Sequence, residues 1–140
     1  MQQKAKPIKV LIAKTSIDAH WVGPMLVTMA LRDAGMEVVH GVQMSSEQIV
    51  QTAIQEDVDV IGLNLCGRYR TLFEVMEMLR ERHLEDKLVI VGGVIPQEGI
   101  PRLKGIGVDE TFPPGSSLDS IVNYIRENVD RKKPTAAQSE

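Results

Sequence analysis

The chain has 140 residues, of which 43% are hydrophobic and 25% are charged, as expected for one soluble domain with one core. Its formal net charge of −3 argues against general nucleic-acid binding, which usually needs a basic face. The single cysteine, Cys66, excludes a disulfide framework within the chain. No apolar run approaches the roughly 20 residues that span a bilayer, and the first residues lack a signal-peptide core, so we expect a cytoplasmic protein.

The chain begins with a strand pattern, a helix pattern and a second strand pattern. The apolar run over residues 8–13 predicts the first strand. Apolar residues at the i, i+3, i+4, i+7 spacing then predict an amphipathic helix that starts at Val22 and ends at Gly35. Its expected buried face consists of Val22, Met25, Leu26 and Met29. Residues 37–41 predict the second strand.

Two helices with capping-box spacing flank the third predicted strand. Ser45 and Gln48 have the spacing of a capping box and precede a helix. Its expected apolar face consists of Ile49, Val50, Ala53 and Ile54. Residues 58–63 predict the third strand, and Thr71 with Glu74 suggests a second capping box. The helix that follows is expected to bury Leu72, Val75, Met76 and Leu79.

The last part of the chain repeats the alternation. Residues 88–91 predict a fourth strand, residues 98–104 a short helix, and residues 110–112 a weak fifth strand. The last helix is expected to start near Ser117. Its expected apolar face consists of Leu118, Ile121, Val122 and Ile125.

The pattern as a whole predicts an α/β fold. The first, third and fourth strands are nearly continuous runs of Val, Ile and Leu, which is typical of parallel strands covered on both faces. Five such strands with intervening helices favour a three-layer, flavodoxin-like (Rossmann-like) sandwich with strand order 2-1-3-4-5. We expect an N-terminal extension over residues 1–7, one domain over 8–129 and a polar, disordered tail over 130–140.

Four loops should share the edge of the sheet at which the parallel strands end. These loops cover residues 14–23, 64–69, 92–96 and 113–117. Ligands of such sheets bind at this edge, and glycine lets backbone approach a ligand closely. The Gly92–Gly93 pair therefore suggests a bulky group beside the fourth strand, although a tight left-handed turn explains the pair equally well. Gly115 with Ser116 offers amides and a hydroxyl near a helix start, which suit polar or phosphate groups.

A histidine and a carboxylate lie close together in the first of these loops. Asp18 precedes His20 by two residues, and a carboxylate that holds one imidazole nitrogen prepares the other nitrogen to ligate a metal. Lys14 could anchor Asp18, or could be a solvated strand end. On its own His20 would be read as a surface residue, but Asp18 and the small residues of the shared edge favour a metal ligand.

Other histidines and other functions are disfavoured by the sequence. We interpret His40 and His83 as surface residues. No G-x-G-x-x-G follows the first strand and no Walker phosphate loop is present. A receiver domain would need an acidic cluster after the first strand and an aspartate after the third, where this chain has Ala13-Lys14 and Asn64.

The motif Asp18-x-His20-x-x-Gly23, the glycine pair and Gly115-Ser116 together resemble the cobalamin-binding domain of methylmalonyl-CoA mutase and its relatives. The resemblance covers roughly residues 8 to 128. It implies that His20 replaces the dimethylbenzimidazole base of the cofactor as the lower ligand of cobalt. It also implies that Asp18 holds the other ring nitrogen and that Lys14 extends the relay. The displaced nucleotide tail would lie in a slot lined by Gly92, Gly93, Gly115 and Ser116.

The chain departs from the family pattern in two places. Family members usually have a serine-x-leucine element after the third strand, where this chain has Asn64 and Leu65. They also commonly have glycine before the histidine and charged residues after it, where this chain has Ala19 and Trp21. The resemblance thus implies a cofactor-binding set of Lys14, Asp18, Ala19, His20, Trp21, Gly23, Asn64, Leu65, Gly92, Gly93, Gly115 and Ser116, with no catalytic residue assigned.

The resemblance also implies an activity and a partner. It points to the small subunit of an adenosylcobalamin-dependent acyl-CoA mutase, in a family that includes 2-hydroxyisobutyryl-CoA mutase. A separate large TIM-barrel subunit would bind the acyl-CoA, so the chain alone would be inactive. One alternative is a corrinoid carrier of a methyltransferase system, but a helical bundle usually precedes such domains and only residues 1–7 precede the first strand. The other alternative is a non-catalytic cobalamin-binding module.

Overall fold

The computed structural model describes residues 6–15, 22–66 and 69–132. Five strands form one parallel sheet: β1 (Lys9–Lys14), β2 (Glu37–Gln43), β3 (Val60–Cys66), β4 (Leu88–Val94) and β5 (Glu110–Phe112). Their order is β2-β1-β3-β4-β5, which confirms the predicted flavodoxin-like topology. Within these ranges no helix is long and apolar enough to cross a bilayer.

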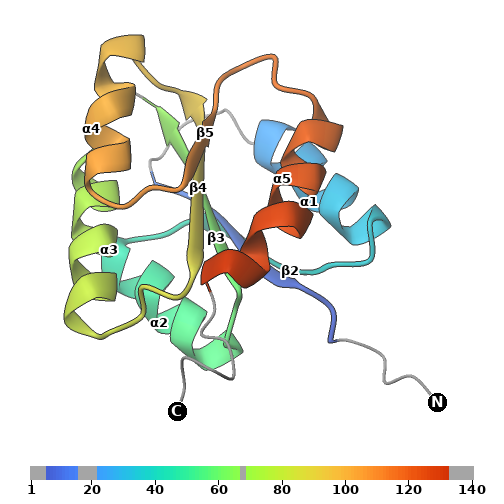
Figure 1. The fold of residues 1–140 in the computed structure, drawn as a ribbon, viewed down its shortest axis with the longest axis horizontal. Coiled ribbons are helices and arrows are strands. Elements are labelled where there is room, and N and C mark those ends of the chain that lie inside the picture. The colour runs from blue at the N-terminus through green and yellow to red at the C-terminus, as the bar shows by residue number, and fades with distance from the viewer. Residues whose placement is uncertain (1–5, 16–21, 67–68, 133–140) are drawn as a thin grey trace.

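Helices cover both faces of the sheet. They are α1 (Val22–Asp33), α2 (Ser46–Glu56), α3 (Arg70–Glu81), α4 (Ile100–Gly105), which follows the short 3₁₀ turn η1 (Gln97–Gly99), and α5 (Leu118–Lys132). Figure 1 shows α1 and α5 together on one side of the sheet, and α2, α3 and α4 on the other. The ends of the central strands therefore lie between two helical layers.

The strands β3 and β4 continue past the ends of their apolar runs. The sequence predicts that they stop at residues 63 and 91, yet the ladder goes on through the pairs Asn64–Gly92 and Leu65–Gly93. Asparagine and glycine are poor strand formers, so the pattern gives no signal there. Asn64 and Gly92 pair with a strand on each side, with Lys14 of β1 and Phe112 of β5 as their outer partners, which keeps them in the sheet.

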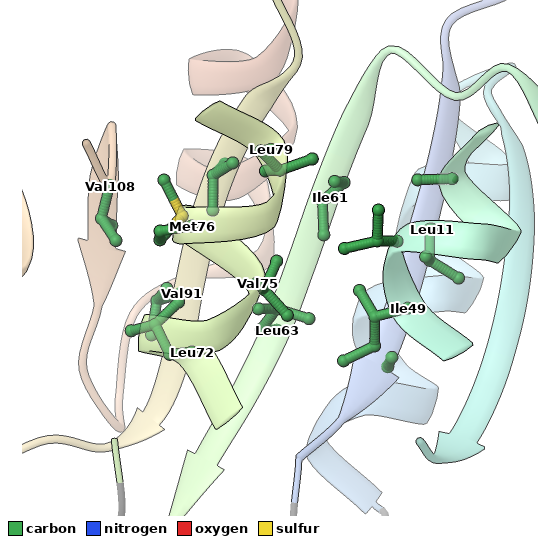
Figure 2. Close-up of a cluster of buried hydrophobic side chains, with 14 of the residues drawn as sticks. Leu11, Ile49, Ile61, Leu63, Leu72, Val75, Met76, Leu79, Val91 and Val108 are labelled. Carbon is green, nitrogen blue, oxygen red and sulfur yellow. The ribbon is translucent and has the colours of Figure 1, made fainter. Parts of the chain in front are cut away.

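The side of the sheet covered by α2 and α3 has a continuous apolar core. Figure 2 shows its side chains, which come from the two helices and from alternate residues of β1, β3 and β4. The residues labelled there are Leu11, Ile49, Ile61, Leu63, Leu72, Val75, Met76, Leu79, Val91 and Val108. The predicted apolar face of α3 is confirmed in full, as is that of α2 except for Ile54, whose exposure is 41%.

One of the two predicted capping boxes forms. The Ser45 backbone N–H donates to Gln48 Oε1 over 2.9 Å, and the Gln48 N–H donates to Ser45 Oγ over 3.2 Å. The prediction for Thr71 and Glu74 is wrong. Helix α3 begins at Arg70, with Tyr69 in place of Thr71 as its N-cap and no capping side chain, so Thr71 lies inside the helix.

Helix α1 packs through a different face from the predicted one. Met25, Leu26 and Met29 are 41%, 47% and 54% exposed, whereas Thr28 and Leu31 are buried. Residues with the same helical spacing occur on both faces of this helix, so periodicity alone cannot choose between them. The side chain of Thr28 lies 2.8 Å from His40 Nδ1. His40 is therefore a partly buried packing residue and the surface interpretation was wrong, whereas His83 is exposed as predicted.

Helix α5 starts and ends with identifiable contacts. Ser117 Oγ accepts the N–H of Ser120 over 3.1 Å at its start. Ile121, Val122 and Ile125 are buried as predicted, while Leu118 is 37% exposed. The helix runs to Lys132, whose ammonium group lies 3.2 Å from Asp109, so residues 130–132 belong to the helix and not to the predicted disordered tail. Residues 133–140 lie outside the described residues.

Candidate functional site

A cavity of about 520 Å³ lies between the sheet and the layer formed by α1 and α5. Its volume is within the range of small-molecule sites. Its floor comes from β1, β3 and β4, its walls from the two helices, and its rim from the loop after β5. The residues that line it include Ile12, Gly23, Val27, Gly62, Asn64, Ile90, Gly92, Gly93, Gly115, Ser116 and Ile121.

Glycines in the two central strands leave room for this cavity. In the sheet register Ile12 pairs with Gly62, and Gly62 pairs with Ile90, so one row across three strands has a glycine at its centre. A Cβ on Gly62 would lie 2.8 Å from Ile12 Cδ1 and 3.5 Å from Ile90 Cγ1. Side chains alternate between faces along a strand, so Gly92 lies on the same face as Ile90. Both missing side chains therefore enlarge the space under α1 and α5.

Gly62 is not among the site residues that the sequence predicts. The available signal was a glycine inside an otherwise apolar run, which often marks a close approach of another group to the strand. The sequence also gives no signal for four apolar lining residues, because their apolar character fits an ordinary core equally well. These residues are Ile12, Ile90, Val27 and Ile121. Only the arrangement of the helices over the sheet makes them walls and floor of a cavity.

The two glycines at the end of β4 have different structural roles. Gly92 opens the cavity, since a Cβ there would meet only Phe112 O, at 3.5 Å. Gly93 has a φ of +101°, and a Cβ there would collide with the Leu65 carbonyl oxygen and lie 2.8 Å from Asn64 Oδ1. Of the two interpretations of the pair, room beside the strand therefore applies to Gly92, and a left-handed backbone applies to Gly93.

Polar groups gather at the rim of the cavity. The N–H and Oγ1 of Thr15 each donate to the Asn64 carbonyl oxygen over 3.2 Å, which joins the ends of β1 and β3. Gly115 has a φ of +92°, and Ser116 donates to the Pro113 carbonyl oxygen through its N–H over 3.1 Å and through its Oγ over 2.7 Å. This turn holds the Ser116 hydroxyl beside the cavity, where it can still accept a hydrogen bond.

The remaining predicted site residues lie at the end of β1, in α1, on β3 or outside the described ranges. Lys14 is only 6% exposed, so the alternative of a solvated strand end is wrong. Gly23 lines the cavity. Leu65 also borders it, but its side chain belongs to the core on the opposite face. Asp18, Ala19, His20 and Trp21 are among residues 16–21, which lie outside the described residues.

The described part of the cavity lining is uncharged. Among the described residues that line it, only Asn64 and Ser116 have hydrogen-bonding side chains and none is charged. No cluster of three or more potential metal-ligating side chains occurs in the described ranges. The described lining thus suits a mainly apolar group that carries polar atoms at the end nearer the rim.

Comparison with known proteins identifies the family. A family model described as a B12 binding domain matches residues 8–122. The chain belongs to the B12-binding domain family. It is 44% identical over 126 residues to the 2-hydroxyisobutanoyl-CoA mutase small subunit of Aquincola tertiaricarbonis, covering 85% of this chain and 93% of that subunit. It is 36% identical over 122 residues to the pivalyl-CoA mutase small subunit of Xanthobacter autotrophicus, covering 86% and 82%.

Among solved structures, this B12-binding domain is similar to the receiver domain of the Francisella response regulator 1452. The TM-score is 0.71, with 16% sequence identity over 90% of this chain and 99% of that domain. At this identity the likeness shows the shared fold alone. Asn64 stands where a receiver domain would need an aspartate after the third strand.

Proposed function

We propose that the chain is the cobalamin-binding small subunit of an adenosylcobalamin-dependent acyl-CoA mutase, an isomerase. The family match and the two small-subunit relatives support this proposal. The observation that carries it is the cavity over Gly62 and Gly92. A domain of this fold without a buried ligand would fill that space with side chains, because protein interiors are close-packed.

The residues present fit the nucleotide tail of cobalamin. This tail ends in dimethylbenzimidazole, a flat and largely apolar base, and the base is joined to the corrin ring through a ribose and a phosphate. The apolar floor around Gly62 suits the base. The rim groups of Asn64, Gly115 and Ser116 suit the polar atoms, with Asn64 in the place of the serine that family members usually have.

We assign His20 as the lower ligand of cobalt. Asp18 would accept a hydrogen bond from the second imidazole nitrogen and so fix the ring for ligation. The burial of Lys14 at the end of β1 supports its part in this relay, because a buried ammonium group is stable only beside anionic or polar partners. Gly23 then lets α1 start directly beside the cavity.

Bound adenosylcobalamin supplies a cobalt–carbon bond whose homolysis starts a radical carbon-skeleton rearrangement. The chain contributes ligation and a shaped cavity, whereas a large TIM-barrel subunit contributes the acyl-CoA site. Leu26 and Val94 line the cavity and are 47% and 55% exposed. We assign these exposed apolar side chains to the surface that the corrin ring and the large subunit cover.

The decisive experiment is the visible and electron paramagnetic resonance spectrum of cobalamin bound to the full chain. We expect a base-off cofactor, with hyperfine coupling from one histidine nitrogen in the cobalt(II) form. His20→Ala removes this coupling, because the cobalt loses its protein ligand. His83→Ala is the control, since His83 is exposed and distant in sequence.

Two results would contradict the proposal. One is an unchanged spectrum in His20→Ala, and the other is a cofactor whose own base stays on cobalt. Acyl-CoA isomerisation is expected only when a large subunit is added, so turnover by the pure chain would refute the division of labour between two subunits.

A further inference from the structure

The end of β1 is paired differently on its two sides. Toward β3 the register is continuous as far as the pair of Lys14 with Asn64. Toward β2 the register shifts between Ile12 and Lys14, and the Lys14 carbonyl oxygen accepts the Met44 N–H over 2.9 Å. A shift of this kind bends a strand locally. Regular pairing therefore holds the last residue of β1 against β3 and not against β2.

Thr15 extends this attachment one residue past the strand. Its N–H and its Oγ1 both donate to the Asn64 carbonyl oxygen, each over 3.2 Å. A carbonyl oxygen has two lone pairs and can accept both bonds. Threonine is branched at Cβ, which restricts rotation about χ1, so the hydroxyl bond also limits the orientation of the backbone at this residue. Thr15 is thus attached to β3 twice, through its main chain and through its side chain.

The place of Thr15 in the chain gives this attachment its importance. Thr15 is the last described residue before residues 16–21, and α1 begins at Val22. Asp18 and His20 follow Thr15 by three and five residues. A segment whose first residue is already fixed has less conformational entropy to lose when one of its side chains binds a ligand. The Thr15 hydroxyl therefore acts at the start of the segment that carries the histidine motif.

We infer that Thr15 is a positioning residue for the lower ligand of cobalt. Its hydroxyl holds the start of the segment that carries His20 against β3, and thereby strengthens the bond between the imidazole and the metal. The inference rests on the proposed function, because it requires His20 to ligate cobalt. Thr15 is not among the described residues that line the cavity, so its effect is exerted through His20 and not through contact with the nucleotide tail.

Three substitutions isolate the contribution of the hydroxyl. Thr15→Val removes the Oγ1 donor and keeps both the N–H and the branched shape. Thr15→Ser keeps the donor on a side chain that rotates more freely. Thr28→Val is the matched control, because it removes a hydroxyl that lies 2.8 Å from His40 Nδ1, at a buried residue that does not line the cavity.

The probe is cobalt(II) cobalamin, titrated into the full chain labelled with nitrogen-15. The visible spectrum gives the affinity, and the electron paramagnetic resonance spectrum gives the share of bound cobalt that carries a protein nitrogen. The label distinguishes that nitrogen from the unlabelled base of the cofactor, because the two isotopes split the signal into different numbers of lines.

We expect Thr15→Val to weaken binding of the probe by at least about threefold, as for the loss of one hydrogen bond. It should also lower the share of cobalt that carries a protein nitrogen. Thr15→Ser should restore most of the affinity and of the nitrogen coupling. Thr28→Val should leave both unchanged, although it lowers the free energy of unfolding.

A double-mutant cycle with His20→Ala separates positioning from general damage to the fold. Because the hydroxyl acts through His20, Thr15→Val should cause no further loss of affinity once the imidazole is removed. A purely structural role of the hydroxyl would instead weaken binding by the same factor in both backgrounds.

The outcomes separate the inference from the proposed function. Unchanged affinity and nitrogen coupling in Thr15→Val overturn the role of Thr15 and leave the lower ligand intact. Absence of a protein nitrogen on cobalt in the unmodified chain overturns the assignment of His20, and with it the inference. Loss of affinity in Thr15→Val that is equal with and without His20, or equal to the loss in Thr28→Val, overturns the positioning role.

Discussion

At the end of β4, Gly92 and Gly93 face opposite sides of the sheet. Gly92 borders the cavity, whereas Gly93 combines a φ of +101° with a position at which a Cβ would collide with the Leu65 carbonyl oxygen of β3. Side chains rarely adopt that backbone conformation, and the neighbouring carbonyl of Leu65 cannot move without disturbing the ladder. Of these two adjacent glycines, one thus leaves room for the cavity and the other meets a requirement of the backbone.

We expect Gly93→Ala to lower the free energy of unfolding by about 1–3 kcal/mol or more, because strain and a backbone collision add. Gly92→Ala should change stability by less than about 1 kcal/mol, since its Cβ makes only an ordinary contact. It should nevertheless weaken cobalamin binding. Urea unfolding and spectral titration of both variants check these expectations, and equal stability of the two would contradict the assigned roles.

At the scale of elements, the two capping-box spacings provide a direct comparison. Ser45 and Gln48 exchange both hydrogen bonds, whereas Thr71 makes no capping bond. We therefore expect Ser45→Ala to lower the free energy of unfolding by about 1 kcal/mol, and Thr71→Ala to change it by less than about 0.5 kcal/mol. Chemical unfolding of the two variants measures the difference, and a larger loss in Thr71→Ala would show that the helix start has been misplaced.

The order and type of the elements could be predicted because apolar runs and helical spacing carry that information locally. The packing face of α1 could not, since both faces of that helix have the required spacing. Thr28 is buried there against His40, while three larger apolar side chains face outward. That choice depends on where β2 lies beside the helix, which is a property of the assembled fold.

The candidate site, too, could be predicted from the sequence only in part. Gly92, Gly115 and Ser116 could be placed on one rim from topology alone, because parallel strands end at the same edge. Gly62 and the apolar walls could not be chosen, since an isoleucine in a core and an isoleucine at a cavity floor have the same local sequence pattern. The roles of Asp18 and His20 remain predictions, tested by the spectra described above.

At the scale of the molecule, the ionisation of the Tyr124 hydroxyl makes the free energy of unfolding depend on pH in the alkaline range. Burial raises the pKa of Tyr124, and the nearby Asp109 carboxylate raises it further. The unfolded chain therefore loses this proton at a lower pH than the folded chain. The resulting contribution to stability is complete below about pH 10, the ordinary tyrosine pKa, and is lost as the pH rises through the higher folded-state value.

Measuring the free energy of unfolding between pH 8 and 11 tests this link. Tyr124→Phe keeps the edge-to-face contact with Phe112 and removes the titrating group, so its stability should fall less steeply above about pH 10. Lys9, whose pKa is raised first by its contact with Glu56, titrates in both proteins and cancels in the comparison. Parallel curves for the two proteins would refute the contribution of Tyr124.

The cavity lies on only one side of the sheet, under α1 and α5, while the core under α2 and α3 is filled (Figure 2). This asymmetry has an evolutionary consequence. Under the proposed function, substitutions under α1 and α5 change the ligand site while the opposite layer retains the apolar core that it forms with the sheet. Diversification of ligand preference in this lineage is therefore expected to concentrate in one helical layer.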